Sequence, residues 1–300
     1  MTSISEIIRK RYSCRSFSDD PIAESVLQSF RQMVNAPQKG LFGNNPRFVL
    51  ISMDTVSRDE WKKLGTYGVI KNAHWYLAGM ISPAPMATQD YGYCKEKLIL
   101  KAAEMGLNTC WLGGTFAISA FGRAAGMRRN ELLPTISPVG YAARRRSLTE
   151  RVMRGFAGSD HRLPWSALFF NGSIPTPLTP EEAGAYREAL ENVRLAPSAS
   201  NKQPWRIIYE PNRKIFLFYL SRAIGYKHLR DVSLQEIDIG IALCHFDLTV
   251  KALGIAGNWR QDDAAPDQIM GIHGNLAGHL TKAVESGAYR ERIYPKRCGS

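Results

Sequence analysis

The sequence predicts an α+β fold built from two similar halves, and three observations lead to that prediction. The chain has 300 residues, about twice the size of a common domain. Two different patterns of helix and strand each occur twice, in the same order along the chain. Hydrophobic residues make up 44% of the chain and charged residues 22%, which provides enough apolar surface for a substantial core.

The first repeated pattern is a helix that ends at an Ala-Pro pair, followed by a polar loop and a strand. In the first half the pair is at residues 36–37 and the strand at 46–51, and in the second half they are at 196–197 and 204–209. A proline disfavours the helical conformation in the residue before it, so each helix is expected to stop at the alanine. The β-branched residues after the loop are typical of a strand.

The second repeated pattern is an apolar helix that ends at a glycine, followed by a short strand that contains a tryptophan. It spans residues 92–111 and 240–259, which align without a gap. A glycine just past the last helical residue commonly terminates a helix. The two copies are 160 residues apart in the first pattern and 148 apart in the second, so the halves differ in the length of their loops.

The boundary between the halves is expected in a stretch rich in proline over residues 162–177, before a helix that begins near Glu181. We assign residues 1–163 to the first half and residues 164–300 to the second. Two copies of one unit in a single chain suggest a fused form of a symmetric dimer.

The chain is basic, with 39 Lys and Arg against 27 Asp and Glu and a formal charge of +12 at pH 7. Half of this excess lies between residues 123 and 162, where nine arginines accompany three acidic residues. Such a charge favours a nucleic acid, an anionic membrane surface or a phosphorylated small molecule. The chain has no nucleic-acid-binding motif and no basic run with interleaved aromatic residues, so a nucleic-acid partner is not expected.

Several other classes of protein are disfavoured. No run of about 18 apolar residues is present, and the first residues lack the pattern of a secretory signal. The five cysteines have no C-x-x-C spacing and the six histidines are scattered, so neither a disulfide framework nor a metal site is expected. No catalytic acid or base is evident. We therefore expect a cytoplasmic protein with no membrane partner and no bound metal.

Two segments carry residues that suit a bound ligand. After a first helix over about residues 4–11, Arg11, Ser13 and Arg15 alternate, so in an extended segment their side chains fall on one side. Two guanidinium groups and a hydroxyl on one side can hold a phosphate, although a solvated basic loop would look the same. In the second half, residues 195–205 place several short polar side chains before a tryptophan. This loop can satisfy the carbonyls and ring nitrogens of a flat heterocycle, although a turn rich in Ser and Asn is the simpler interpretation.

Three motifs together resemble the signatures of the FMN-dependent nitroreductase family. They are Arg-Tyr-Ser-x-Arg-x-Phe at residues 11–17, Gly-Leu-Asn-Thr-Cys-Trp-Leu-Gly-Gly at 106–114, and Ala-Pro-Ser-Ala-x-Asn-x-Gln-Pro-Trp at 196–205. The arrangement is most similar to a tandem-fused branch of that family. The resemblance implies that each half is a mixed, mainly antiparallel sheet flanked by helices, and that the halves pack as an intramolecular pseudo-dimer. A monomer is then the most economical state.

The resemblance also implies one FMN site assembled from both halves. The first half keeps the Arg/Ser segment, but its counterpart of the polar loop, at residues 36–46, has lost the motif. The second half keeps the loop but lacks an Arg-x-Ser-x-Arg segment and a Leu-Gly-Gly counterpart. The residues implied to bind the cofactor are Arg11, Tyr12, Ser13, Arg15, Gly113, Gly114, Arg144, Arg146, Pro197, Ser198, Ala199, Asn201 and Gln203.

Within this set the resemblance implies distinct roles. Arg11 and Ser13 would hold the FMN phosphate, and Arg15 would lie near the N1/O2 edge of the flavin ring, where positive charge stabilises the anionic reduced form. Gly113 and Gly114 would present backbone N–H groups to flavin N5, with no Cβ in the way. Arg144 and Arg146 would reach back to the phosphate, with Arg145 as an alternative and a solvated surface as the other interpretation of this triplet.

The activity implied is that of an FMN-dependent NAD(P)H oxidoreductase. Hydride passes from NADH or NADPH to the flavin and then to a small acceptor such as a nitroaromatic or a quinone. The alternative is a protein on the same fold that binds or senses FMN without turnover. The partners expected are a nicotinamide nucleotide and a small-molecule acceptor.

Overall fold

The computed structural model describes residues 2–53, 70–114, 116–144, 161–222, 232–261 and 268–273. The first part of the chain forms α1 (Ile4–Lys10), α2 (Glu24–Asn35), β1 (Arg47–Ser52), β2 (Trp75–Met80), α4 (Ala87–Glu104), β3 (Asn108–Thr109), α5 (Ile118–Ala124) and β4 (Ile136–Gly140). The second part forms α7 (Trp165–Leu168), β5 (Phe169–Asn171), α8 (Arg187–Arg194), β6 (Trp205–Glu210), β7 (Ile215–Leu220), α9 (Leu234–Ala252), β8 (Gly257–Gln261) and β9 (Gln268–His273). Short 3-10 turns occur at Gly184–Tyr186 and Ala199–Asn201.

Two sheets with the same strand order form the frame of the molecule. The first has the order β1-β2-β4-β3, with every pair antiparallel. The second has the order β5-β6-β7-β9-β8, in which β5 joins the edge in parallel and the other pairs are antiparallel. Apart from β5, each strand of the second sheet occupies the position of its counterpart in the first. The fold is therefore α+β, with mainly antiparallel sheets.

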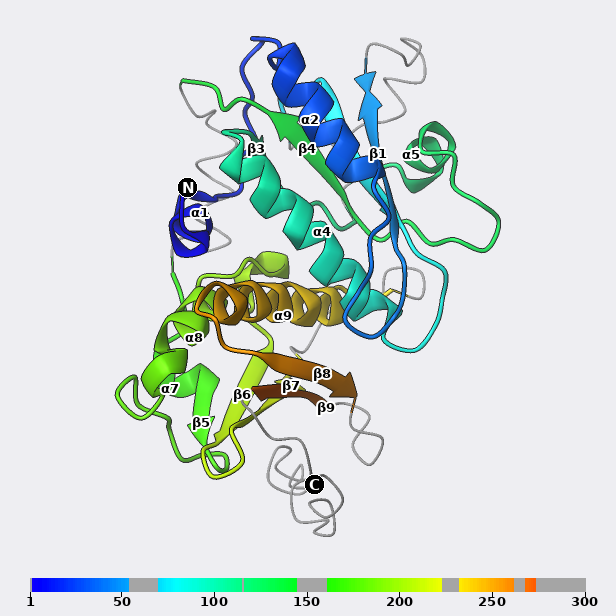
Figure 1. Cartoon of the computed structure of the whole chain (residues 1–300). Helices are drawn as coiled ribbons and strands as arrows, with labels where there is room; N and C mark the ends of the chain where they lie inside the picture. The colour runs from blue at the N-terminus through cyan, green and yellow to red at the C-terminus, as the bar shows by residue number, and fades with distance from the viewer. Residues whose placement is uncertain are drawn as a thin grey trace, which may run out of the picture.

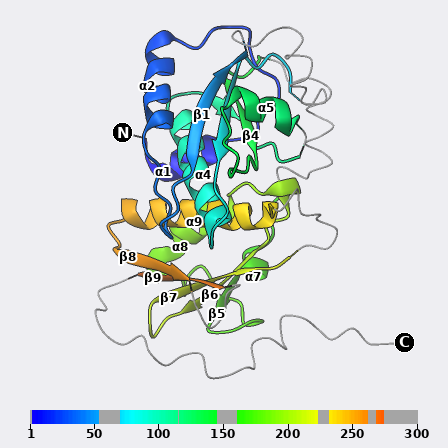
Figure 2. The same ribbon diagram turned by 90° about the vertical axis from the view of Figure 1, so that its right-hand side faces the viewer.

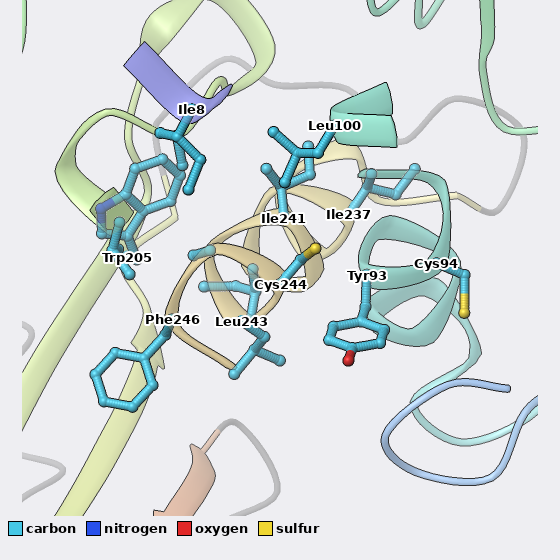
Figure 3. Packing of buried hydrophobic residues seen from close by; sticks show 14 of the residues in the cluster. Ile8, Tyr93, Cys94, Leu100, Trp205, Ile237, Ile241, Leu243, Cys244 and Phe246 are labelled. Carbon is cyan, nitrogen blue, oxygen red and sulfur yellow. The ribbon is translucent and has the colours of Figure 1, made fainter. Parts of the chain in front are cut away.

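Two long helices lie between the sheets. In Figures 1 and 2 the first sheet, α4, α9 and the second sheet follow one another as successive layers, with α2 beside the first sheet. Fourteen of the nineteen residues of α9 are buried, as expected for a helix that is covered on most sides. Figure 3 shows the apolar core around these helices, with Leu100 of α4, Ile241 of α9, Ile8 of α1 and Trp205 of β6 in one cluster.

The two central helices approach each other backbone to backbone at a pair of glycines. A Cβ on Gly92 of α4 would lie 2.2 Å from the Ile237 carbonyl oxygen, and a Cβ on Gly240 of α9 would lie 2.0 Å from the Gln89 carbonyl oxygen. Only glycine allows this approach, because real Cβ atoms do not come that close to another atom. Gly92 and Gly240 are 148 residues apart in the sequence, and so are Gln89 and Ile237, whose carbonyls they approach. The contact is therefore reciprocal.

Most predicted boundaries agree with the structure, and two do not. Helix α2 stops before Ala36, and Gly106 and Gly254 follow α4 and α9 with positive φ angles of 78° and 73°. The prediction of a helix near Glu181 was wrong, because that stretch forms turns and a 3-10 segment before α8 begins at Arg187. The prediction that Trp111 lies in a strand was also wrong, because β3 ends at Thr109.

Candidate functional site

The segment after α1 is extended and runs beside the residues that follow α4. Ser13 forms a parallel bridge with Thr109, and the Cys14 N–H donates to the Thr109 carbonyl at 2.9 Å. Cys14 and Ser16 are buried, whereas Ser13 and Arg15 are partly exposed, which is the alternation expected of an extended segment. Tyr12 is half-buried against the apolar cluster beneath this segment.

The Gly-Gly pair lies a few residues beyond the same stretch. Leu112 bridges Ile136 of β4 and fixes the start of the turn. Gly114 has a φ of 99°, a backbone conformation that favours glycine. A Cβ on Gly113 would lie 2.7 Å from Cδ2 of Leu234, the first residue of α9. The Gly-Gly turn therefore packs closely against α9.

The polar loop of residues 197–203 is strained and held by internal hydrogen bonds. Ser200, Asn201 and Gln203 have φ angles of 48°, 54° and 48°, an uncommon conformation for residues with a Cβ. The Gln203 N–H donates to Ser198 Oγ at 2.8 Å. Positive φ angles at three residues cost free energy, and such strain clusters at binding sites and switch regions.

The amide side chains of this loop form hydrogen bonds with residues 161–163, which come just before α7. Asn201 Nδ2 donates to the His161 carbonyl at 2.7 Å, and its Oδ1 accepts from Arg162 at 3.0 Å. Gln203 is buried, and its Oε1 accepts from the Leu163 N–H at 3.0 Å. These bonds shape the loop, and direct binding of a ligand by either amide stays a prediction.

The first turns of α9 connect the Gly-Gly turn with the polar loop. Leu234 lies against Gly113, and one helical turn later both carboxylate oxygens of Asp238 accept from the Ala199 N–H, at 3.0 and 3.1 Å. Asp238 is buried, and that burial raises its pKa well above the usual carboxyl range, although the bond from Ala199 acts to lower it. Two predicted binding segments about 85 residues apart in the sequence thus meet on one helix end.

Two side chains have buried donor nitrogens that find no hydrogen-bond partner among the described residues. They are Nε and Nη1 of Arg15, in the segment after α1, and Nε2 of Gln235, which lies between Leu234 and Asp238 in the sequence. A buried donor without an acceptor costs about 1–3 kcal/mol. Such donors suit a ligand that carries hydrogen-bond acceptors.

Comparison with known proteins identifies the family. A family model described as "Putative TM nitroreductase" matches residues 3–250. The chain belongs to this nitroreductase family. A crystal structure of a "putative nitroreductase" from Thermotoga maritima MSB8 is similar, with 20% identity and a TM-score of 0.57 over 90% of this chain and 94% of that chain. None of the curated proteins compared with the chain matches it.

Shorter nitroreductases align with about half of this chain. A nitroreductase family protein from Clostridium novyi NT has 17% identity and a TM-score of 0.40, over 48% of this chain and 87% of that one. A nitroreductase with bound FMN from Desulfitobacterium hafniense DCB-2 has 14% identity and a TM-score of 0.39, over 49% and 93%.

The remaining residues predicted to bind the cofactor are the arginines at 144–146 and the start of the polar loop. Arg144 is exposed on the segment after β4, and its approach to the phosphate stays a prediction. Arg145 and Arg146 lie outside the described residues. Pro197, Ser198 and Ala199 are half-buried in the polar loop.

Metal-ligand clusters and membrane-spanning helices are absent from the described ranges. No group of three or more His, Cys, Asp or Glu in these ranges could hold a metal ion. Cys14, Cys94, Cys110 and Cys244 are buried and form no disulfide with one another. No helix among the described residues is both long and apolar enough to span a membrane.

No sequence motif points to the residues of α9 that contact the two predicted binding segments. Leu234, Gln235 and Asp238 belong to no motif, and their importance comes from contacts with loops far away in the chain. One signal was available, because Asp238 is the counterpart of Asp90 at the 148-residue offset. Asp90 accepts from the Phe42 and Asn44 N–H groups at 3.0 and 2.9 Å, so each carboxylate holds the loop of its own half.

Proposed function

We propose that the protein is an FMN-dependent NAD(P)H oxidoreductase that reduces nitroaromatic, quinone or similar small acceptors through one composite FMN site. Membership of the nitroreductase family supports an oxidoreductase. The observation that carries the composite site is the convergence at α9, where Leu234 contacts Gly113 and Asp238 holds Ala199. The Gly-Gly turn comes from the first part of the chain and the polar loop from the second.

The residues at this place fit a flavin. The buried, unpartnered nitrogens of Arg15 and Gln235 are donors, and the flavin ring offers carbonyl oxygens and ring nitrogens as acceptors. Leu234 fills the space where a Cβ of Gly113 would project, so this glycine lets the turn pack against α9. We assign the backbone N–H groups of Gly113 and Gly114 to flavin N5. Arg11 and Ser13 lie on the segment that begins at the end of α1, and we assign the phosphate to them.

In the proposed reaction, bound FMN supplies the hydride chemistry, between NADH or NADPH and the acceptor. The chain supplies binding and electrostatics. Arg15 would supply a positive charge near the flavin ring, and such a charge favours the anionic reduced form. Asp238 orders the polar loop through its bonds to Ala199, and the loop then closes one side of the site.

We further propose that the two halves, 1–163 and 164–300, form an intramolecular pseudo-dimer and that the protein is a monomer. The reciprocal approach of Gly92 and Gly240 supports this. In a two-fold arrangement, every contact between the two halves occurs a second time between the equivalent residues with the halves exchanged. The shared strand order of the two sheets supports it as well. Small molecules are the partners proposed, and neither a nucleic acid nor a membrane is among them.

Anaerobic titration of the FMN-loaded protein with NADH and then NADPH tests the activity. We expect the flavin absorbance near 450 nm to bleach with at least one of the two, and to return when a quinone or nitroaromatic is added. A flavin that stays oxidised in excess of both nucleotides would overturn the reductase and support the alternative, a protein that binds FMN without turnover.

A further inference from the structure

Trp111 comes just before the Gly-Gly turn, and its side chain is held against α4. Its indole N–H donates to Glu96 Oε2 at 2.7 Å. The Nζ of Lys95 lies over the face of the indole ring, 4.7 Å from its centroid. An indole nitrogen can only donate, so the bond to Glu96 forms in either protonation state of the carboxyl group. The indole is therefore fixed at its edge and covered on one face.

The carboxyl group of Glu96 is a rigid anchor for the indole. It is fully buried, and its other oxygen, Oε1, has partners from both halves of the chain. Oε1 lies 3.0 Å from Nε2 of His245 in α9 and 4.0 Å from Nε of Arg11. Turning this group away from Trp111 would leave buried polar atoms unpaired, which is unfavourable. The position of Trp111 is therefore set by the packing of α4 against α9.

The chain between Trp111 and the Gly-Gly turn is short and well ordered. Leu112, the one residue between Trp111 and Gly113, exchanges two backbone hydrogen bonds of 3.0 Å with Ile136 of β4. Gly113 in turn packs against Leu234. Neighbouring Cα atoms are about 3.8 Å apart, so there is little slack over this distance. A change in the position of Trp111 therefore moves the backbone N–H groups of the turn.

We propose that Trp111 and Glu96 are positioning residues that hold the N–H groups of Gly113 and Gly114 where they can donate to flavin N5, an inference that rests on the proposed function. N5 of oxidised FMN accepts a hydrogen bond, whereas N5 of reduced FMN carries a proton. A donor at this position therefore favours the oxidised form and tunes the potential of the bound flavin. A displaced turn weakens the binding of oxidised FMN and leaves that of reduced FMN nearly unchanged.

The second half contains a matched control for this bond. Trp259 is the counterpart of Trp111 at the 148-residue offset, and its indole N–H donates to Oδ1 of the buried Asp247 in α9 at 2.9 Å. Strand β8 continues beyond Trp259, at the place where the first half has the Gly-Gly turn. The same kind of bond is thus present in both halves, and the bond of Trp111 is the one that adjoins the proposed flavin site.

The test compares the affinities of full-length variants for oxidised and reduced FMN, whose ratio sets the midpoint potential of the bound flavin. Trp111→Phe removes the indole N–H and keeps an aromatic ring. We expect it to bind oxidised FMN about tenfold more weakly and reduced FMN as the wild type does. This raises the two-electron potential of bound FMN by about 30 mV relative to the wild type. Trp259→Phe should leave that potential unchanged.

Trp111→His separates the hydrogen bond from the loss of packing. The histidine ring can place its Nε2 where the indole nitrogen lies, although the side chain is smaller than tryptophan. We expect this variant to keep the potential of the wild type. Equal weakening of both redox forms in Trp111→Phe, the same potential shift in Trp111→His or Trp259→Phe, or a Trp111→Phe protein that does not fold would overturn the proposal. A wild type that binds no FMN would instead overturn the proposed function, and this inference with it.

Discussion

At the residue scale, the buried polar side chains near the site are of two kinds. Some form hydrogen bonds within the chain and shape the polar loop, and others carry donors that suit a ligand. Gln203 and Gln235 are both buried glutamines near the polar loop. Gln203 uses its amide within the chain, whereas Nε2 of Gln235 has no partner. A buried amide donor without an acceptor does not stabilise the folded protein. We therefore expect the Gln235 donor to contribute to the binding of a ligand.

This contrast yields a matched pair of substitutions. Gln235→Met should leave the unfolding free energy of the flavin-free protein unchanged or higher, and should weaken FMN binding by about tenfold. Gln203→Met should destabilise the flavin-free protein by about 1–3 kcal/mol, because the partly buried Leu163 N–H loses its acceptor. Urea unfolding and FMN titration of both variants provide the measurements. A destabilised Gln235→Met with normal FMN affinity would show that this glutamine is structural.

Asp238 predicts a dependence of stability on pH. Its folded pKa is raised by burial, so the folded state binds a proton more readily than the unfolded state. The stability from this group is fully present below the unfolded pKa and is lost as the pH rises through the folded pKa. In urea unfolding, we expect the unfolding free energy of Asp238→Asn to increase relative to that of the wild type as the pH is raised from 4 to 8. A difference that is constant over this range would contradict the raised pKa.

At the element scale, α4 and α9 determine how the two sheets are placed. Their approach at Gly92 and Gly240 leaves no room for a side chain, and the Tyr93 hydroxyl adds a bond of 2.6 Å to Asp247 across the same contact. Burial raises the pKa of Tyr93, helped by the nearby charge of Asp247, so this hydroxyl stays protonated as the donor. The helix pair is thus fixed by shape and by a hydrogen bond.

Alanine substitutions at the glycines test this contact. Gly240→Ala should lower the unfolding free energy by about 1–3 kcal/mol, because its Cβ would meet the backbone of Gln89. Gly122→Ala in α5 is the control, since a Cβ there meets only the flexible end of Met127 and alanine favours a helix by up to about 1 kcal/mol. Thermal and urea unfolding compare the two. Equal stability of both variants would show that the helices can separate at little cost.

At the scale of the whole molecule, the sequence predicts what is encoded locally and misses what depends on distant contacts. The ends of α2, α4 and α9 follow from the Ala-Pro pair and the terminal glycines, and the repeat predicts two similar halves. The Glu96–His245 pair joins residues 149 positions apart, so no local pattern points to it. The start of α8 is also missed, because the residues after Glu181 that form turns resemble the beginning of a helix in their local sequence.

The composite site also predicts an effect of substitutions from both halves. Arg11→Ala should weaken FMN binding by removing a phosphate ligand, and Asn201→Ala should weaken it by releasing the polar loop from His161 and Arg162. Lys214→Ala, at an exposed turn between β6 and β7, should have no effect. FMN titration by fluorescence compares the three, and full retention of FMN by either of the first two variants would contradict a site built from both halves.

The central claim is that one chain holds one FMN, between the Gly-Gly turn of the first half and the polar loop of the second. Equilibrium dialysis of the full-length protein against saturating FMN measures this number most directly. The account predicts one FMN per chain. Two FMN per chain would mean that both halves keep a working site, and no bound FMN would mean that the fold has been kept without the flavin.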